Sequence, residues 1–191
     1  MEKSKLIIVE GPQGTGKSTL ANGLRSTMAS TYLHSLSGHK DKTQTGLQLS
    51  IEMYDIEMDY LRNLKRISMN HVYDRIFTSE EVYARLGFKE YSFTDEYKRY
   101  CEELNRLAFD IYYLNLYLGD PKLYEQRLNN RGEHHKYQAF SGESSMRQEE
   151  MYGIVANELK QYDNINVFNI KTDISPIVTL DEVRKLIRVK E

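Results

Sequence analysis

The sequence predicts an α/β fold: a parallel β-sheet with helices on both faces. Five short strand-like segments alternate along the chain with stretches of helical periodicity, which is typical of parallel strands joined by crossover helices. A glycine-rich turn directly follows the first segment and leads into a helical stretch, as in a strand–loop–helix unit. No repeat, low-complexity segment or proline-rich linker interrupts the 191 residues. We therefore expect a single domain over residues 1–191.

Five strands are expected. The first contains Leu-Ile-Ile-Val at residues 6–9, a short apolar run of the kind found in strands buried on both faces of a parallel sheet. The predicted strands cover residues 5–10, 31–36, 70–74, 110–117 and 165–170.

Helices are predicted where apolar residues recur every three or four positions. Pro121 falls in the first turn of a helix that is expected to run to about Asn130, because proline is tolerated there. A closing helix is expected to open at Asp181. Two apolar stripes are expected to pack in the core: Leu47, Ile51, Tyr54, Met58 and Leu61, and Tyr97, Tyr100, Cys101, Leu104, Leu107 and Ala108.

The stretch from residue 131 to residue 145 differs from the rest of the chain. It is polar, contains Gly132 and Gly142, and has no clear period. A loop of this length in a compact domain is usually an active-site lid or a disordered segment. We therefore expect a lid over residues 131–145.

Residues 11–18 read G-P-Q-G-T-G-K-S, which fills every fixed position of the P-loop motif G-x-x-x-x-G-K-[ST]. The glycines let the backbone turn its N–H groups toward phosphate oxygens, and the helix N-terminus that follows favours the same anion. Lys17 is expected to reach the β- and γ-phosphates of ATP, and Ser18 to ligate Mg²⁺. The residues expected to bind the nucleotide are Gly11, Gln13, Gly14, Thr15, Gly16, Lys17, Ser18 and Thr19.

Three ionisable residues stand at the ends of the first and third expected strands. Glu10 precedes the P-loop, and Asp74 and Arg75 close the third strand. Ligands of an open α/β sheet bind beyond the carboxyl ends of its strands. Asp74 could therefore hold Mg²⁺, and Arg75 could grip a phosphate with its planar fork. Glu10 could accept a proton from an attacking hydroxyl or bind the acceptor. The alternative for Asp74 and Arg75 is a surface ion pair, and the alternative for Glu10 is a side chain that points into solvent.

Three further residues are candidates for contact with substrate. Arg127 and Arg131 lie four positions apart at the start of the expected lid, on one helical face. Closure of the lid would let them neutralise charge on the transferring phosphoryl group, and the alternative is a pair of solvated cations. Tyr83, on the helix after the third strand, either stacks on a base or packs in the interior.

Charge and cysteine content narrow the function classes. The net charge is −2, and no basic tract points to nucleic acid or a membrane surface as a partner. Cys101 is the only cysteine, so an internal disulfide is excluded. The N-terminal apolar run is far shorter than a signal peptide or a membrane span. We therefore expect the protein in the cytoplasm.

Several motifs resemble those of a known enzyme family. Residues 9–19, V-E-G-P-Q-G-T-G-K-S-T, resemble the E-G-x-x-G-x-G-K-[ST] start shared by thymidylate kinases and deoxynucleoside kinases. Asp74-Arg75, followed by Ser79 and Tyr83, resembles the thymidylate kinase signature D-R-[YF]-x-x-S and matches the deoxynucleoside kinase form E-R-S less well. Residues 120–133 and 148–152 resemble the helices that enter and leave the thymidylate kinase lid. The likeness runs in order over about residues 5–175.

The resemblance implies a P-loop NTPase fold with the sheet order 2-3-1-4-5 and with ATP and Mg²⁺ as cofactors. Lys17 and Ser18 would bind the ATP phosphates and the metal, which Asp74 would assist. Arg75 would bind the phosphate or 5′ end of the acceptor, and Glu10 would take the position of the base in deoxynucleoside kinases. A homodimer through helices at about 46–66 and 78–85 is also implied.

Two departures from the family pattern fall near the acceptor pocket. Residues 37–42, S-G-H-K-D-K, replace the T-R-E-P-G-type segment that follows the second strand in thymidylate kinases. Ile76 replaces the aromatic residue after D-R. These changes are typical of a divergent member, such as those of phage and prophage genomes.

We therefore expect a phosphotransferase that moves the γ-phosphoryl group of ATP to a (deoxy)nucleoside monophosphate such as dTMP. One alternative is a nucleoside or another small alcohol as acceptor. A different class of alternative is a nucleotide-binding regulatory protein that hydrolyses its ligand without an acceptor. The GTPase signatures N-K-x-D and D-x-x-G are not found, which weighs against that class.

Overall fold

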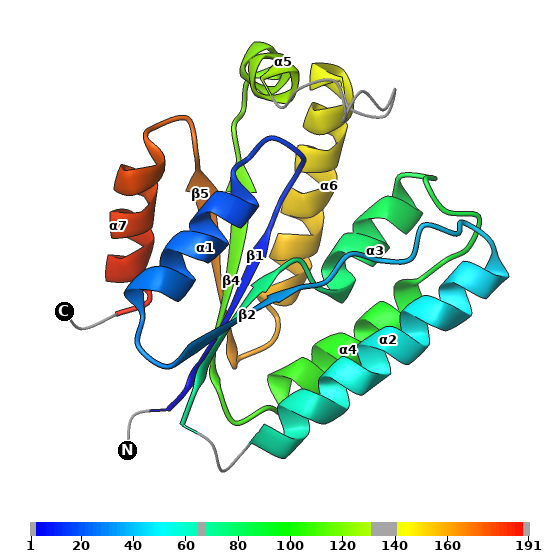
Figure 1. Ribbon diagram of the computed structural model, residues 1–191. Coiled ribbons are helices and arrows are strands. Elements are labelled where there is room, and N and C mark those ends of the chain that lie inside the picture. The colour runs from blue at the N-terminus through cyan, green and yellow to red at the C-terminus, as the bar shows by residue number, and fades with distance from the viewer. Residues whose placement is uncertain (1–2, 65–67, 131–140, 189–191) are drawn as a thin grey trace.

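The computed structural model describes residues 3–64, 68–130 and 141–188. Within these ranges, each strand is followed by one or two helices (Figure 1). In chain order the elements are β1 (Lys5–Glu10), α1 (Lys17–Thr27), β2 (Thr31–Ser35), α2 (Gln44–Asn63), β3 (Asn70–Asp74), α3 (Phe77–Arg85), α4 (Thr94–Asn105), β4 (Asp110–Tyr117), α5 (Pro121–Asn129), α6 (Gly142–Leu159), β5 (Ile165–Lys171) and α7 (Pro176–Leu186).

The strands form one parallel sheet in the order β2-β3-β1-β4-β5, which confirms the expected fold class and topology. The five strand positions are also confirmed, except that β2 ends one residue earlier, at Ser35, and β5 one residue later, at Lys171. Val9 of β1 lies opposite Asp74 of β3, and Glu10 lies opposite Asn115 of β4. The P-loop and the end of β3 therefore emerge side by side.

Helices cover both faces of the sheet (Figure 1). Ile7 and Val9 of β1 point to the face that packs against α1 and α7. Leu6 and Ile8 point to the opposite face, which α2, α3, α4 and α6 cover. All four side chains are fully buried, and burial of each stabilises the fold by about 1.5–3 kcal/mol. The strand that leads into the P-loop is thus held from both sides.

Two helices begin with a proline in the first turn. Pro121 opens α5 as expected, and the Asp120 side chain caps this helix by accepting a hydrogen bond from the backbone N–H of Lys122 at 2.8 Å. The expected start of the last helix at Asp181 is wrong, because α7 already begins at Pro176. Proline suits the first helical position, where its missing N–H needs no partner.

The segment that was expected to form a lid ends in more helix than the sequence predicted. α6 begins at Gly142, and the side chain of Ser141 caps it by accepting a hydrogen bond from the backbone N–H of Ser144 at 3.0 Å. The last four residues of the expected loop are therefore the first turn of a helix. Residues 131–140 of the expected lid lie outside the described residues.

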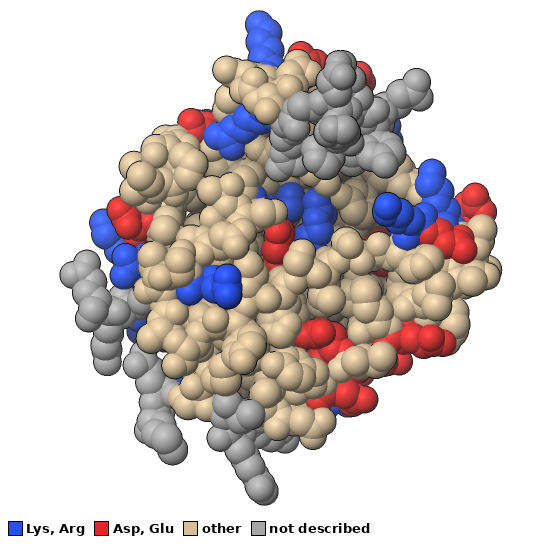
Figure 2. Space-filling view, in the orientation of Figure 1, with Lys and Arg blue, Asp and Glu red and all other residues tan. Residues whose placement is uncertain are grey.

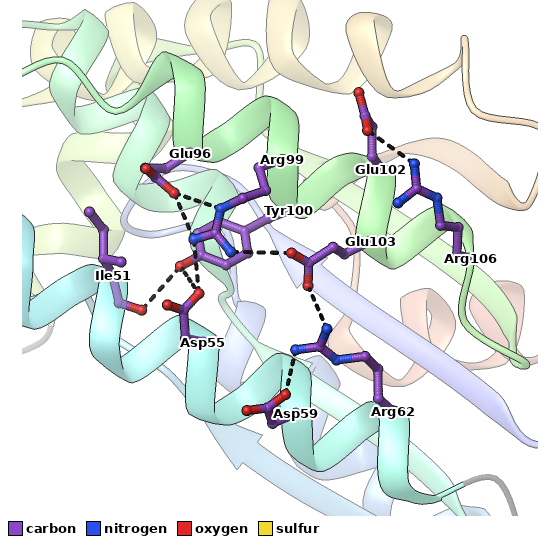
Figure 3. Close-up of polar contacts among 10 residues, drawn as sticks. All are labelled: Ile51, Asp55, Asp59, Arg62, Glu96, Arg99, Tyr100, Glu102, Glu103 and Arg106. Atoms are coloured by element: carbon purple, nitrogen blue, oxygen red, sulfur yellow. Dashed lines mark hydrogen bonds and ion pairs between the residues drawn. The ribbon is translucent and has the colours of Figure 1, made fainter.

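A chain of ion pairs joins α2 and α4 along their exposed sides (Figure 3). Arg99 of α4 contacts Asp55 of α2 at 2.8 Å and Glu103 at 3.2 Å, while Arg62 of α2 reaches Glu103 at 3.7 Å. Tyr100 donates a hydrogen bond to Asp55 at 2.8 Å and lies 4.2 Å from the guanidinium of Arg99. Exposed pairs contribute about 0–1 kcal/mol each, so the buried apolar stripe beneath them contributes more to this helix pairing.

Cys101 lies in the core as expected, and burial raises the pKa of its thiol to about 12. Ala108, which was expected on the same apolar stripe, is exposed, because α4 ends at Asn105 and the chain turns before β4. Among the helices in the described part of the chain, none is both long and apolar enough to span a lipid bilayer.

Two histidines pack together beneath α2. His34 of β2 and His71 of β3 share a hydrogen bond of 3.0 Å between Nε2 and Nδ1. His34 also stacks on Tyr73 with ring centroids 4.4 Å apart and lies 3.5 Å from the carboxylate of Glu57. Burial, together with the neighbouring His34, lowers the pKa of His71 to about 4. Burial also lowers the pKa of His34, although Glu57 opposes that change.

Acidification is expected to destabilise the protein through His71. Its pKa lies below the ordinary value of 6.5, so the unfolded chain binds more protons, and stability falls as the pH drops from about 6.5 toward 4. Between pH 7 and pH 5 the loss from His71 is about 2 kcal/mol. Urea unfolding at both pH values measures it. The His71→Gln variant has no titrating group at this position, so it should lose less stability over the same pH interval. An equal loss in both proteins would contradict the assignment of this pH dependence to His71.

Candidate active site

The P-loop approaches its neighbouring strand too closely for a side chain at its first position. Gly11 has a φ of 137°, and a Cβ atom there would lie 2.3 Å from the carbonyl oxygen of Leu116 on β4. Gly16, with a φ of 86°, turns the chain into α1, which starts at Lys17 without a side-chain cap. The N–H groups of the first helical turn are therefore oriented for an anionic ligand.

A small cavity of about 190 Å³ lies beside the P-loop. The Ser18 hydroxyl donates a hydrogen bond to Asp74, and the ammonium group of Lys17 donates to the carbonyl oxygen of Pro12. Hydroxyl and carboxylate oxygens are the ligands that Mg²⁺ prefers, so Ser18 and Asp74 fit a magnesium site. The cavity is lined by Gln13, Lys17, Ser18, Ser35, Ser37, Asp74 and Arg75.

Glu10 does not face this cavity. Its side chain is fully buried, and one carboxylate oxygen accepts hydrogen bonds from the Ile76 N–H at 2.8 Å and the Thr78 hydroxyl at 2.7 Å. The other oxygen accepts from the Ser79 hydroxyl at 2.6 Å. Burial raises the pKa of Glu10, while the charge of Arg75 and these hydrogen bonds oppose the increase. The carboxylate therefore joins the end of β1 to the start of α3.

Arg75 has an unusual backbone and a pinned side chain. Its φ of 76° lies in the left-handed region, which residues other than glycine rarely adopt. One guanidinium nitrogen, Nη1, lies 3.1 Å from the Ser79 hydroxyl, 3.1 Å from the Tyr83 hydroxyl and 3.0 Å from the Tyr152 hydroxyl. Strained residues of this kind often occur at functional sites.

A second cavity, of about 420 Å³, lies on the far side of Arg75. It shares the lining residues Gln13, Ser37 and Arg75 with the small cavity, so the two are neighbours. Figure 2 shows Lys and Arg atoms beside Asp and Glu atoms in the hollow between α1 and α3. The other residues that line the larger cavity are Gly38, His39, Lys40, Lys42, Ser79, Glu80, Tyr83, Phe88, Lys89 and Gln148.

A third cavity, of about 260 Å³, lies on the opposite side of the P-loop. Arg127 of α5 lines it and donates hydrogen bonds to the carbonyl oxygens of Gly14, at 3.3 Å, and of Thr172. Arg127 therefore does not point toward Arg75. The lining residues are Gly14, Thr15, Gly16, Thr19, Leu20, Arg127, Thr172, Ile174, Pro176 and Thr179.

The structure divides the sequence-predicted site residues into groups. Arg131 lies outside the described residues. Glu10 is enclosed behind the site, and Tyr83 lines the larger cavity while packing 5.9 Å from the ring of Phe88. The residues that surround the small cavity are Gln13, Lys17, Ser18, Asp74 and Arg75, and those around the third cavity are Gly14, Thr15, Gly16, Thr19 and Arg127.

Sequence reasoning missed several residues at the larger cavity. Glu80 and Gln148 are buried, and each has a side-chain oxygen without a hydrogen-bond partner among the described residues. Tyr152 contacts Arg75 across 77 positions of sequence. Gln148 and Tyr152 belong to the segment 148–152 that resembles the helix after the lid, but the resemblance assigned neither of them a role. Glu80 carries no motif of its own and lies on the helix that follows Asp74-Arg75.

No protein-family model and no curated protein matches the sequence. Solved structures do match over nearly the whole chain. The YorR protein of Bacillus subtilis, solved with phosphorylated GDP, is 22% identical, with 96% of this chain and 95% of that chain covered and a TM-score of 0.66.

Thymidylate kinase from Candida albicans is 13% identical, covering 99% and 96% of the two chains with a TM-score of 0.67. Deoxyadenosine kinase from M. mycoides, solved with dCMP and dCDP, is 17% identical, covering 97% and 100% with a TM-score of 0.62. At these identities the likeness shows a shared fold.

Gly11→Ala is expected to abolish nucleotide binding and to lower the melting temperature, because its Cβ atom would overlap the Leu116 carbonyl. Gly153→Ala in α6 is the control: a Cβ atom there meets nothing within 4 Å, and alanine is favoured over glycine in a helix by about 1 kcal/mol. Thermal unfolding and ATP titration of both variants test this. Normal ATP affinity in Gly11→Ala would refute the role of the close approach.

Proposed function

We propose that this protein transfers the γ-phosphoryl group of ATP to a (deoxy)nucleoside monophosphate such as dTMP. One observation carries the proposal: the small cavity at Lys17, Ser18 and Asp74 and the larger cavity have Arg75 as a common lining residue. A phosphate donor in the first and an acceptor in the second would meet at that point. Such transfer needs mainly positioning and charge neutralisation, because its transition state requires little covalent help.

The donor would lie along the P-loop. Its phosphates would face Lys17 and the N-terminus of α1, and its base end would occupy the third cavity, next to Arg127 and Thr172. Ser18 and Asp74 would hold Mg²⁺, which would supply positive charge to offset the negative charge of the phosphates. In this proposal Arg127 orients the nucleotide, and Arg131 stays a predicted lid residue.

The acceptor would lie in the larger cavity with its phosphate at Arg75. Lys40 and Lys42 line the same cavity and are exposed, which favours a phosphate-bearing acceptor over an uncharged one. Because both oxygens of Glu10 are occupied, we propose that Glu10 holds α3 in place and does not accept the acceptor's proton. The ligands of the structural neighbours, which include phosphorylated GDP and dCMP, support a nucleotide in this fold.

A nucleoside is the second candidate acceptor, because deoxyadenosine kinase is among the structural neighbours. The homodimer also stays a prediction. An ADP-release assay with ATP, Mg²⁺ and each monophosphate, paired with its nucleoside, separates the two acceptor classes. Turnover with nucleosides alone would replace the proposal by the second candidate, and ATP binding without any acceptor-dependent turnover would refute both.

Lys17→Ala is expected to lower kcat by about 10²–10³-fold, because it removes the ammonium group that would stabilise the charge on the transferring phosphoryl group. Lys98→Ala, on the exposed surface of α4, is the control and should keep the activity of the unaltered protein. The same ADP-release assay measures both variants.

Arg127 and Arg75 are expected to contribute to the binding of different substrates. Arg127→Ala should raise the KM for ATP about tenfold and leave the acceptor KM within about twofold, whereas Arg75→Ala should do the reverse. Steady-state kinetics with each substrate varied in turn provides the measurement. An equal effect of either variant on both KM values would contradict the proposed arrangement of the cavities.

A further inference from the structure

We propose that Tyr152 of α6 is a positioning residue for Arg75, and that its hydroxyl group thereby sets the affinity of the site for the acceptor. The inference rests on the proposed function, because it takes Arg75 as the group that binds the acceptor. It gives a role to a residue that the sequence resemblance placed only at the helix after the expected lid.

The hydroxyl of Tyr152 belongs to a directed chain of hydrogen bonds. Ser79 has one hydroxyl proton and donates it to the Glu10 carboxylate at 2.6 Å. The Ser79 oxygen therefore accepts the proton of Tyr152, whose oxygen lies 2.8 Å away. The Tyr152 oxygen in turn accepts an N–H of Arg75 at 3.0 Å. The chain runs from the guanidinium through two hydroxyls to a buried carboxylate, and its members polarise one another.

These hydrogen bonds hold the guanidinium of Arg75 by a single nitrogen, Nη1. All three described partners of Arg75 contact Nη1, and no described residue bonds Nε or Nη2. Arg75 lines both the small and the larger cavity. An arginine binds phosphate best when two parallel N–H groups are presented in a fixed plane. Tyr152 supplies the most distant of the three anchors in sequence and so ties that plane to α6.

The remaining geometry favours a directional role over simple packing. The Tyr152 side chain is fully buried, and burial raises the pKa of its hydroxyl well above the ordinary value, so the group stays protonated and can donate. The Arg75 backbone is left-handed, so its side chain starts from an unusual direction. Without Tyr152, a buried N–H would lose a partner and the guanidinium could rotate.

Tyr152→Phe tests the proposal, because it removes only the hydroxyl. We expect the KM and Kd for the acceptor monophosphate to rise about tenfold, with the KM for ATP unchanged within about twofold. Tyr54→Phe is the matched control: Tyr54 is equally buried, and its hydroxyl has no hydrogen-bond partner among the described residues. Ser79→Ala, which breaks the same chain one hydroxyl further along, should reproduce the acceptor-selective loss even if Tyr152→Phe folds poorly.

A double-mutant cycle separates positioning from general packing. If Tyr152 acts through Arg75, Tyr152→Phe should change acceptor affinity little in an Arg75→Ala background. An equal loss of acceptor affinity in both backgrounds would overturn this inference but not the proposed function. The same holds if Tyr152→Phe leaves the acceptor KM unchanged while the unaltered protein turns over normally. Failure of the unaltered protein to bind any acceptor would overturn it together with the proposed function.

Discussion

The buried carboxylate of Glu10 is the interaction on which the rest of the site depends. Removing a carboxylate from water costs several kcal/mol, and here three hydrogen bonds and the nearby charge of Arg75 offset that cost. Glu10 immediately precedes the P-loop, and its three donors lie at the start of α3. The same contacts therefore fix the entry to the P-loop and the helix that lines the larger cavity.

The sheet order makes this contact possible. β1 lies between β3 and β4, so its carboxyl end adjoins Asp74 on one side and Leu116 on the other. The small cavity consequently lies where two strand ends and one helix N-terminus meet. The larger cavity and the cavity at Arg127 lie on either side of it, which is a geometry suited to a donor and an acceptor that approach from opposite directions. In such a site, the rate of transfer would depend more on how the donor and the acceptor are positioned than on reactive side chains.

The strand positions, the P-loop and the pair Asp74-Arg75 could be predicted from sequence, because each depends on a few consecutive residues. Ala108 and the start of α7 were predicted wrongly for a related reason: apolar spacing identifies a helical face but places helix ends poorly. For Arg127, the spacing from Arg131 indicated one helical face, yet it contained no information about which side of the P-loop that face would meet.

Glu10 illustrates the difference between what the sequence determines and what the tertiary structure decides. Its place at the end of β1, directly before Gly11, followed from the sequence by itself, as did the α/β fold class, because strand periodicity and turn chemistry are local properties of the chain. Only the tertiary structure decided that this carboxylate is enclosed by α3, that Tyr152 reaches Arg75, and that Arg127 turns away from it. Those outcomes depend on how helices distant in sequence pack on the sheet, and side chains far apart along the chain leave no shared pattern in it.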